Sequence, residues 1–288
     1  MKFSVFTAST PEWSPAEAAT TLAAQGWDGI EWRVTDQQPA ETPGFWAGNK
    51  TTWPLTGLEP RIGEIARITQ DSGLGFSGIG GYTGASDHEN TERMLAVTAE
   101  LGAPRVRVAM PAASVGDYRE LFAATRADIE WVAGRAAHHG VQAVIELHHG
   151  TITPSASAAM RMIDGLDPAH VGVIHDSGNL VFEGYEDYDA AFDLLGEYLA
   201  HVHVKNATRR ALPERSADGA VVWEQGWATL RDGQADLANY FGALARAGYD
   251  GWVTLEDFST ELPLAERTAD NLAYVRSLHE KALHALDR

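Results

Sequence analysis

The chain has 288 residues, of which 44% are hydrophobic and 22% charged, and its formal net charge is −18. A globular composition of this length supports one large core, and an acidic surface repels phosphate backbones, which argues against a nucleic-acid partner. The chain has no cysteine, which excludes disulfides and thiolate metal sites. We expect a cytoplasmic protein without a membrane span, because no apolar run approaches about 20 residues and the N-terminus lacks a signal-like segment.

Short apolar segments alternate with amphipathic segments along the chain. Lys2–Thr7 alternates apolar and polar residues and predicts a first strand. Ser14-Pro15-Ala16-Glu17 is a capping box with proline at the first helical position, so a helix is expected from there to about Gly26. The further predicted strands are Gly29–Arg33, Leu74–Ile79, Arg105–Ala109, Val141–Leu147, Val171–His175, His201–Lys205 and Gly251–Leu255.

Helical spacing and glycine stops mark most of the segments between these strands. The predicted helices are Arg61–Asp71, Asp87–Leu101, Asp117–Gly140, Pro154–Asp164, Tyr188–Leu199, Ala235–Ala247 and a last one from about Pro263. Val34–Glu59 and Asn206–Gly233 show no clear period and are expected to be long loops. Strand–helix alternation without an obvious linker predicts one (β/α)8 TIM barrel over residues 1–288, rather than a doubly wound sheet.

Polar residues end the last four predicted strands of this barrel. They are Glu146, Asp176, His203 and Glu256. Barrels of this type carry their chemistry at the C-terminal ends of the strands. Three carboxylates with one imidazole suit Mn²⁺, Mg²⁺ or Co²⁺ better than structural zinc, and four protein ligands leave positions open for substrate oxygens. We therefore predict a catalytic metal site.

The same motifs resemble the xylose-isomerase-like TIM-barrel superfamily, which includes tagatose 3-epimerase, inosose dehydratase and hydroxypyruvate isomerase. The resemblance covers nearly the whole chain, and its implied metal, usually manganese, is bound by the four strand-end residues named above. The segments that carry it are Glu146-Leu-His148, Asp176-Ser-Gly-Asn179, His203-Val-Lys205-Asn206 and Thr-Leu-Glu256-Asp, with Gly29-Ile-Glu31 near the start.

The chain departs from the ketose epimerases at two positions. Asn179 stands where they carry a histidine three residues after the metal aspartate, and Ile152 stands where they carry a second glutamate. Arg209 retains their arginine six residues after the metal histidine. Residues 146–151, 176–184 and 201–206 resemble more closely the catalytic subunits of C-glycoside deglycosidases. That resemblance implies cleavage of 3-oxo-glycosides by elimination, with a metal and the histidine at position 148.

We therefore expect an enzyme that removes a proton α to a sugar carbonyl. Glu146 and His148 are two residues apart on a strand and should face one cavity. His148 is the expected base because imidazoles titrate near neutral pH. The alternative is an isomerase or epimerase in which Glu146 and Glu256 form the acid–base pair. The site motifs do not choose between these outcomes.

The remaining polar candidates are assigned to the substrate. Arg107, Lys205, Arg209, Asn179 and Trp32 are expected to contact the sugar or glycoside, whereas His149 should point to the opposite face and be structural. The two long loops should lie over the C-terminal mouth. Tryptophans should line the cavity or a contact with a second copy or a small accessory subunit, and they are Trp32, Trp46, Trp53, Trp223 and Trp227.

Two other classes fit the sequence less well. An endonuclease built on the same barrel needs a multi-zinc cluster and a basic face for DNA, whereas this chain has one compact ligand set and a net charge of −18. A barrel that only binds a ligand is disfavoured by the complete set of four metal-binding side chains.

Overall fold

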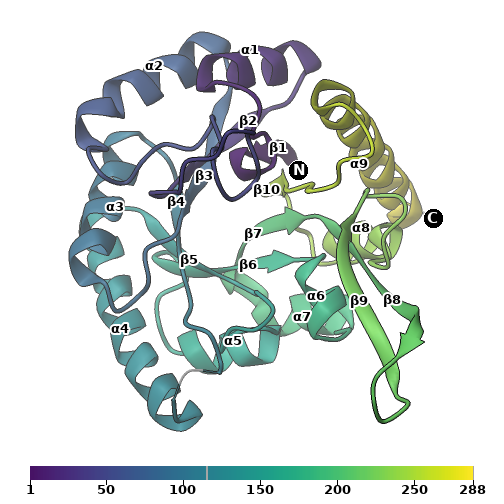
Figure 1. Ribbon diagram of the computed structural model, residues 1–288. Coiled ribbons are helices and arrows are strands. Elements are labelled where there is room, and N and C mark those ends of the chain that lie inside the picture. Colours follow the sequence, from purple (N-terminus) through teal and green to yellow (C-terminus); the bar gives the residue numbers. More distant parts are fainter. Residues whose placement is uncertain (115, 288) are drawn as a thin grey trace.

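The computed structural model describes residues 1–114 and 116–287. Within these residues, parallel strands close into a barrel in the order β1-β10-β7-β6-β5-β4-β3-β2, and helices surround it (Figure 1). The predicted (β/α)8 TIM barrel is confirmed. The barrel strands are β1 (Lys2–Phe6), β2 (Gly29–Val34), β3 (Gly75–Gly81), β4 (Arg105–Val108), β5 (Gln142–Glu146), β6 (Val171–Asp176), β7 (Leu199–Val204) and β10 (Trp252–Leu255).

The helices of the outer layer lie close to the predicted segments, and α6 is an unpredicted short helix directly after β6. The capping box at the start of α1 is present, with the Ser14 hydroxyl accepting from the Glu17 amide. The helices are α1 (Pro15–Gln25), α2 (Ile62–Ser72), α3 (His88–Glu100), α4 (Tyr118–His139), α5 (Ala156–Ile163), α6 (Asn179–Glu183), α7 (Tyr188–Leu195), α8 (Leu237–Arg246) and α9 (Leu264–Leu286). None of those helices combines the length and apolar character that a membrane span needs.

The apolar core lies mainly between the strands and the helices, because outward-facing strand residues such as Ile30, Ile145 and Val202 are fully buried there. The inside of the barrel is polar by contrast. Deep within it, the Ser4 and Thr254 hydroxyls lie 2.6 Å apart, and Thr254 is 3.0 Å from His201 Nε2. A polar barrel interior must satisfy its own hydrogen bonds, so it holds each side chain in one orientation.

One glycine makes room for a ring inside the barrel. A side chain at Gly80 on β3 would place its Cβ 2.0 Å from the Phe6 ring. With glycine there, the Phe6 ring fills the interior and stacks on His203 with centroids 5.8 Å apart. This packing fixes one face of the imidazole that the sequence assigns to the metal.

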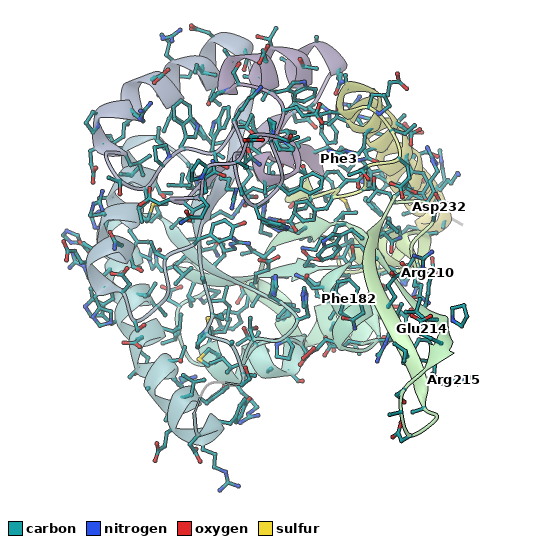
Figure 2. The ribbon with its side chains drawn as sticks, in the orientation of Figure 1. Phe3, Phe182, Arg210, Glu214, Arg215 and Asp232 are labelled. Carbon is teal, nitrogen blue, oxygen red and sulfur yellow. The ribbon has the colours of Figure 1, made fainter. Side chains whose placement is uncertain are left out.

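The segment predicted as a second long loop is an antiparallel hairpin, so that prediction is wrong. It is formed by β8 (Asn206–Arg215) and β9 (Val221–Ala228), which extend from the barrel (Figure 1). Arg210, Glu214 and Arg215 project away from the barrel (Figure 2). Most residues of both strands are exposed or half-buried, so the hairpin lacks the apolar alternation by which strands are predicted.

Candidate metal and substrate site

The four strand-end residues converge at one end of the barrel. One ligand atom from each of Glu146, Asp176, His203 and Glu256 can be chosen so that all lie within 4.8 Å of one another, and all four side chains are buried. Glu146 ends β5, Asp176 ends β6, His203 lies on β7 and Glu256 follows β10. We call these residues the quartet. Their predicted convergence at the C-terminal ends of the strands agrees with this geometry.

His203 presents its Nδ1 to the carboxylates of the quartet. Its Nε2 lies 3.1 Å from Glu31 Oε2, and its Nδ1 lies 3.6 Å from Glu146 Oε1. Nδ1 is buried and forms no hydrogen bond with any described residue. An unpaired buried nitrogen beside three carboxylates is a fitting donor for a divalent cation that prefers oxygen and tolerates imidazole. The residues present therefore fit the metal that the sequence predicts.

Lys205 places a positive charge among the same carboxylates. Its Nζ lies 2.8 Å from Asp176 Oδ2, pairs with Glu256 and is 3.8 Å from Glu146 Oε1. Burial raises the pKa of Asp176 to about 7, opposed by Lys205 and reinforced by the charges of Glu146 and Glu256. The three buried carboxylates outnumber the two cationic side chains beside them, Lys205 and Arg107, so they retain negative charge that a divalent cation would neutralise.

Glu146 is held by two further side chains. Arg107 Nη1 donates to Glu146 Oε2 at 2.6 Å, and the Asn179 amide donates to Oε1 at 3.2 Å. Burial alone would raise the pKa of Glu146, but Arg107, His203 and Lys205 together hold it well below its usual range. Arg107 lines the pocket beside this carboxylate, whereas Asn179 bonds to Glu146 and is almost fully buried.

Both histidines after β5 line the pocket, which contradicts the prediction that His149 faces away. The two-residue alternation of a strand does not continue, because β5 ends at Glu146 and the chain turns with Gly150 at φ +73°. The imidazoles stack with centroids 4.3 Å apart. Burial, with the charge of His148, lowers the pKa of His149.

The two imidazoles have different partners. His148 Nδ1 lies 2.8 Å from the His149 carbonyl oxygen, which can only accept, so Nδ1 carries the proton and Nε2 carries the lone pair. His149 Nδ1 lies 3.0 Å from Asn179 Oδ1. His148 thus presents its imidazole in the pocket wall, and His149 is linked to Glu146 through Asn179.

A pocket of about 410 Å³ opens above Glu146 and Glu256. Aromatic rings from separate segments of the chain form its walls, and Trp46 and Trp227 both contact Phe258, at centroid distances of 4.7 and 5.5 Å. The polar floor and flat apolar walls suit a ligand that combines a polyhydroxyl part with an apolar part. The aromatic wall residues are Trp46, Tyr82, Trp227 and Phe258.

Three of the residues predicted to contact the substrate do not line the pocket: Trp32, Arg209 and Asn179, whose amide donates to Glu146 instead. Trp32 is completely buried in the layer between the strands and the helices, where its Nε1 donates to Thr69 on α2 and its ring packs on Trp53. Its side chain points outward because residues alternate along β2 and the interior positions belong to Glu31 and Arg33. Arg209 is exposed on the hairpin, with its guanidinium 5.5 Å from the centre of the Trp223 ring.

The predicted loops contribute to the mouth in part. Trp46 from the segment after β2 and Trp227 from the hairpin line the pocket, while Trp53 is in the core and Trp223 is exposed. Sequence reasoning missed Tyr82 and the pair Glu31 and His201. The signal for the last two was present, because a charged residue in a short buried strand needs a polar partner.

The comparisons with known proteins agree with this architecture. The family described as "Xylose isomerase-like TIM barrel" matches residues 19–278. An inosose dehydratase from Lacticaseibacillus casei is 29% identical over 132 residues, which are 44% of each chain. Another, from Geobacillus thermodenitrificans, is 30% identical over 125 residues, which are 42% of each chain. The match thus spans less than half the length of these curated relatives.

Solved structures share the whole fold. The apo 3-keto-D-glucoside 4-epimerase YcjR from E. coli superposes with a TM-score of 0.70 at 20% identity, covering 96% of this chain and 99% of that one. L-ribulose 3-epimerase gives a TM-score of 0.73 at 18% identity, covering 100% and 97%. At such identities the likeness concerns the fold alone. The family match extends over most of the present chain, so this chain belongs to the xylose isomerase-like TIM barrel family.

Proposed function

We propose that the protein is a divalent-metal-dependent enzyme that removes a proton from the carbon next to a sugar carbonyl. The observation that carries this proposal is the quartet, whose ligand atoms lie within 4.8 Å of one another. The pocket beside it has the imidazole of His148 in its wall. Glu146, Asp176, His203 and Glu256 would hold the metal, with Mn²⁺ expected and Mg²⁺ or Co²⁺ as alternatives. The bound cation supplies Lewis acidity, which stabilises the charge that develops on the carbonyl oxygen.

His148 is the proposed base. Its side chain lines the pocket, and because Nδ1 donates to the His149 carbonyl, Nε2 is the nitrogen left to accept a proton. Both carboxylates are already engaged, Glu146 by Arg107 and Glu256 by Lys205. For Glu146, the charge of Arg107 stabilises the ionised form and lowers the pKa, so this carboxylate is a poorer base.

Elimination is the outcome that this arrangement favours. The electrons of the broken C–H bond form a carbon–carbon double bond, and the β substituent leaves with its bonding pair. His148 can return its proton to that group. Epimerisation by paired carboxylates would require Glu146 and Glu256 to exchange protons while both are engaged by cationic side chains. The inosose dehydratase relatives, named for loss of water, support the same choice.

The proposed substrates are 3-oxo-glycosides. Their carbonyl and adjacent hydroxyl would face the quartet, and the leaving aglycone would lie against Trp46, Trp227 and Phe258. The second candidate, a ketose isomerase or epimerase, is favoured by Arg107, which is placed beside Glu146 to contact a second sugar oxygen.

Product analysis distinguishes these candidates. Mn²⁺-loaded protein is incubated with a panel of 3-oxo-glycosides and, in parallel, with free ketoses, and products are identified by mass spectrometry and NMR. Release of free aglycone with an unsaturated keto sugar supports elimination. An isomeric ketose as the only product moves the assignment to the epimerase, and no turnover of either panel by metal-loaded protein contradicts the proposal.

A further inference from the structure

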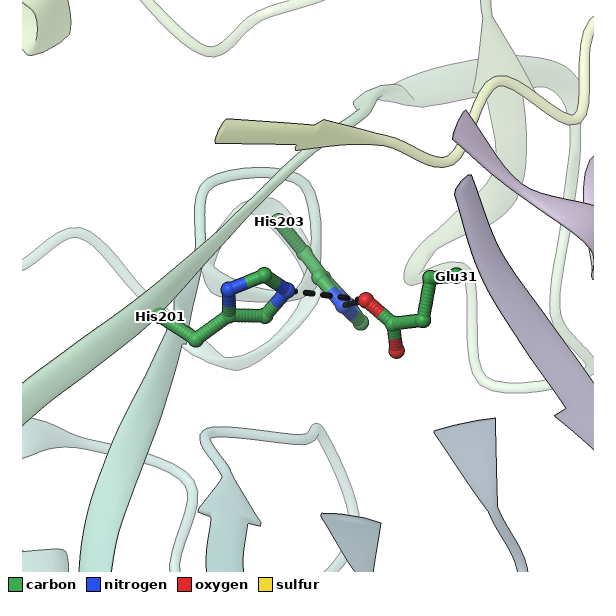
Figure 3. Close-up of side chains that lie close together, drawn as sticks. All are labelled: Glu31, His201 and His203. Carbon is green, nitrogen blue, oxygen red and sulfur yellow. Dashed lines mark hydrogen bonds and ion pairs between the residues drawn. The ribbon is translucent and has the colours of Figure 1, made fainter. Parts of the chain in front are cut away.

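Beneath the quartet lies a second buried cluster, in which one carboxylate joins two imidazoles (Figure 3). Glu31 Oε2 lies 2.8 Å from His201 Nε2 and 3.1 Å from His203 Nε2. All three side chains are at most 2% exposed. Glu31 comes from β2 and the histidines from β7, strands that are not neighbours in the barrel, so the cluster spans its interior.

The partner of His201 defines its protonated nitrogen. Arg105 Nη1 lies 3.5 Å from His201 Nδ1, and an arginine can only donate. His201 Nδ1 is therefore the acceptor, and Nε2 carries the hydrogen directed at Glu31 and Thr254. This leaves the Glu31 carboxylate held from one side by a neutral imidazole.

The same reasoning applies to His203. A carboxylate oxygen accepts, so His203 Nε2 carries a hydrogen, and Nδ1 is the ring nitrogen available to a metal. Nδ1 is directed to the quartet, 3.6 Å from Glu146 Oε1 and without a hydrogen-bond partner in residues 1–114 and 116–287. The Phe6 ring stacked on His203 restricts rotation of the imidazole.

The alternative is that Glu31, His201 and His203 bind a metal ion of their own. The short contacts speak against it, because Glu31 Oε2 already accepts from both imidazoles at hydrogen-bond distance. The cluster also provides only three side chains, one of which is shared with the quartet.

We propose that Glu31 is a positioning residue that accepts the Nε2 hydrogen of His203 and thereby keeps Nδ1 facing the quartet. This inference rests on the proposed metal site and adds a residue that touches neither the metal nor the substrate. Carboxylates behind a metal-binding histidine fix its orientation and raise its basicity, and their loss commonly weakens metal binding by about 10–100-fold.

The test compares Mn²⁺ binding to metal-free wild type, Glu31→Gln and Glu92→Gln by titration calorimetry. Glu92 is the matched control, because its carboxylate also accepts from a histidine, His139, but lies on α3 outside the barrel. We expect the dissociation constant of Glu31→Gln to rise by about 10–100-fold and that of Glu92→Gln to stay near the wild-type value. Thermal unfolding of each metal-free variant checks that it is folded.

The hydrogen on His203 Nε2 is read directly from ¹⁵N NMR of the metal-free wild type, a measurement that does not depend on the variant folding. Hydrogen on Nε2 supports the inference, and hydrogen on Nδ1 alone overturns it. A Glu31→Gln protein that binds Mn²⁺ as tightly as wild type also overturns it. So does binding of two metal equivalents per wild-type chain and only one per Glu31→Gln chain, because Glu31 would then itself be a ligand of a second metal. Failure of the wild type itself to bind contradicts the proposed function instead.

Discussion

His148 carries the most specific claim at the scale of single residues, because it lines the pocket and is the proposed base. We predict that His148→Ala retains Mn²⁺ but loses at least about 10²-fold in rate, the lower end of general-base contributions. Deuterium exchange at the carbon next to the carbonyl should be lost with the rate. His138→Ala, an exposed histidine on α4, serves as the control. Exchange at the wild-type rate in His148→Ala would return the role of base to Glu146 or Glu256.

Lys205 is the residue whose charge matters most before metal binds. Replacing it with methionine leaves buried carboxylates without their ammonium partner, so Lys205→Met should lower the free energy of unfolding of the metal-free protein by about 3–5 kcal/mol. Mn²⁺ should restore more stability to the variant than to wild type, as measured by thermal unfolding. Lys281→Met, at an exposed position on α9, controls for loss of a lysine. Equal stability of Lys205→Met and wild type without metal would show that the ion pairs contribute nothing.

The quartet was predictable from sequence because each member lies at or next to the C-terminal end of a strand, and these ends meet in a closed barrel. His149 was not, because its orientation depends on where β5 stops pairing. Glu31 was visible as a charge within a buried strand, but its partners come from β7, about 170 residues away, and nothing local in the sequence identifies them.

At the scale of elements, the barrel strands were predictable from short, largely apolar runs, whereas the hairpin β8–β9 was not. It presents both faces largely to solvent and therefore has no periodic apolar pattern. Its Ala207 and Trp227 pair across the two strands, which brings the Trp227 ring to the pocket. A tertiary contact, rather than local pattern, gives this hairpin its place over the mouth.

The hairpin carries a matched pair of tryptophans. Trp227→Ala should raise the KM for a substrate with an aromatic aglycone by about 10-fold, since aromatic contacts contribute about 0.5–1.5 kcal/mol beyond area burial. Trp223→Ala, on an exposed part of β9, should leave both KM and kcat unchanged. Steady-state kinetics of the two variants check this, and equal effects of both would remove Trp227 from the substrate site.

Packing between β6 and the helices α7 and α8 predicts a pH dependence of stability. Burial among the rings of Phe192, Tyr188 and Tyr240 lowers the pKa of His175 from an ordinary 6.5 to about 3. Between these values the unfolded chain binds a proton that the folded chain does not. His175 therefore reduces stability as the pH falls through this window, by about 1.4 kcal/mol per pH unit when fully developed.

Replacing this histidine isolates its contribution. His175→Gln should be less sensitive than wild type to a pH decrease from 6 to 4, when denaturant unfolding is followed across that range. The slopes of the unfolding free energy against pH should differ between the two proteins by an amount that approaches the uptake of one proton. Identical slopes for the two proteins would mean that His175 titrates in the folded state as it does in the unfolded chain.

At the scale of the whole molecule, the barrel divides its polar and apolar residues between two layers. The apolar core lies between strands and helices, and the barrel interior contains hydrogen-bonded polar side chains that support the quartet from below. Because that network joins β1, β2, β7 and β10, closure of the barrel and the geometry of the site depend on each other. The site is therefore a property of the complete barrel and not of one segment.

The measurement that tests the central claim most directly is the metal content of purified protein after removal of metal, reloading with Mn²⁺ and dialysis. We predict one equivalent per chain for wild type, and none for Asp176→Asn and His203→Ala, with far-ultraviolet circular dichroism showing that both variants keep the barrel fold. Wild-type protein without stoichiometric metal after reloading, or variants that retain it, would contradict the account.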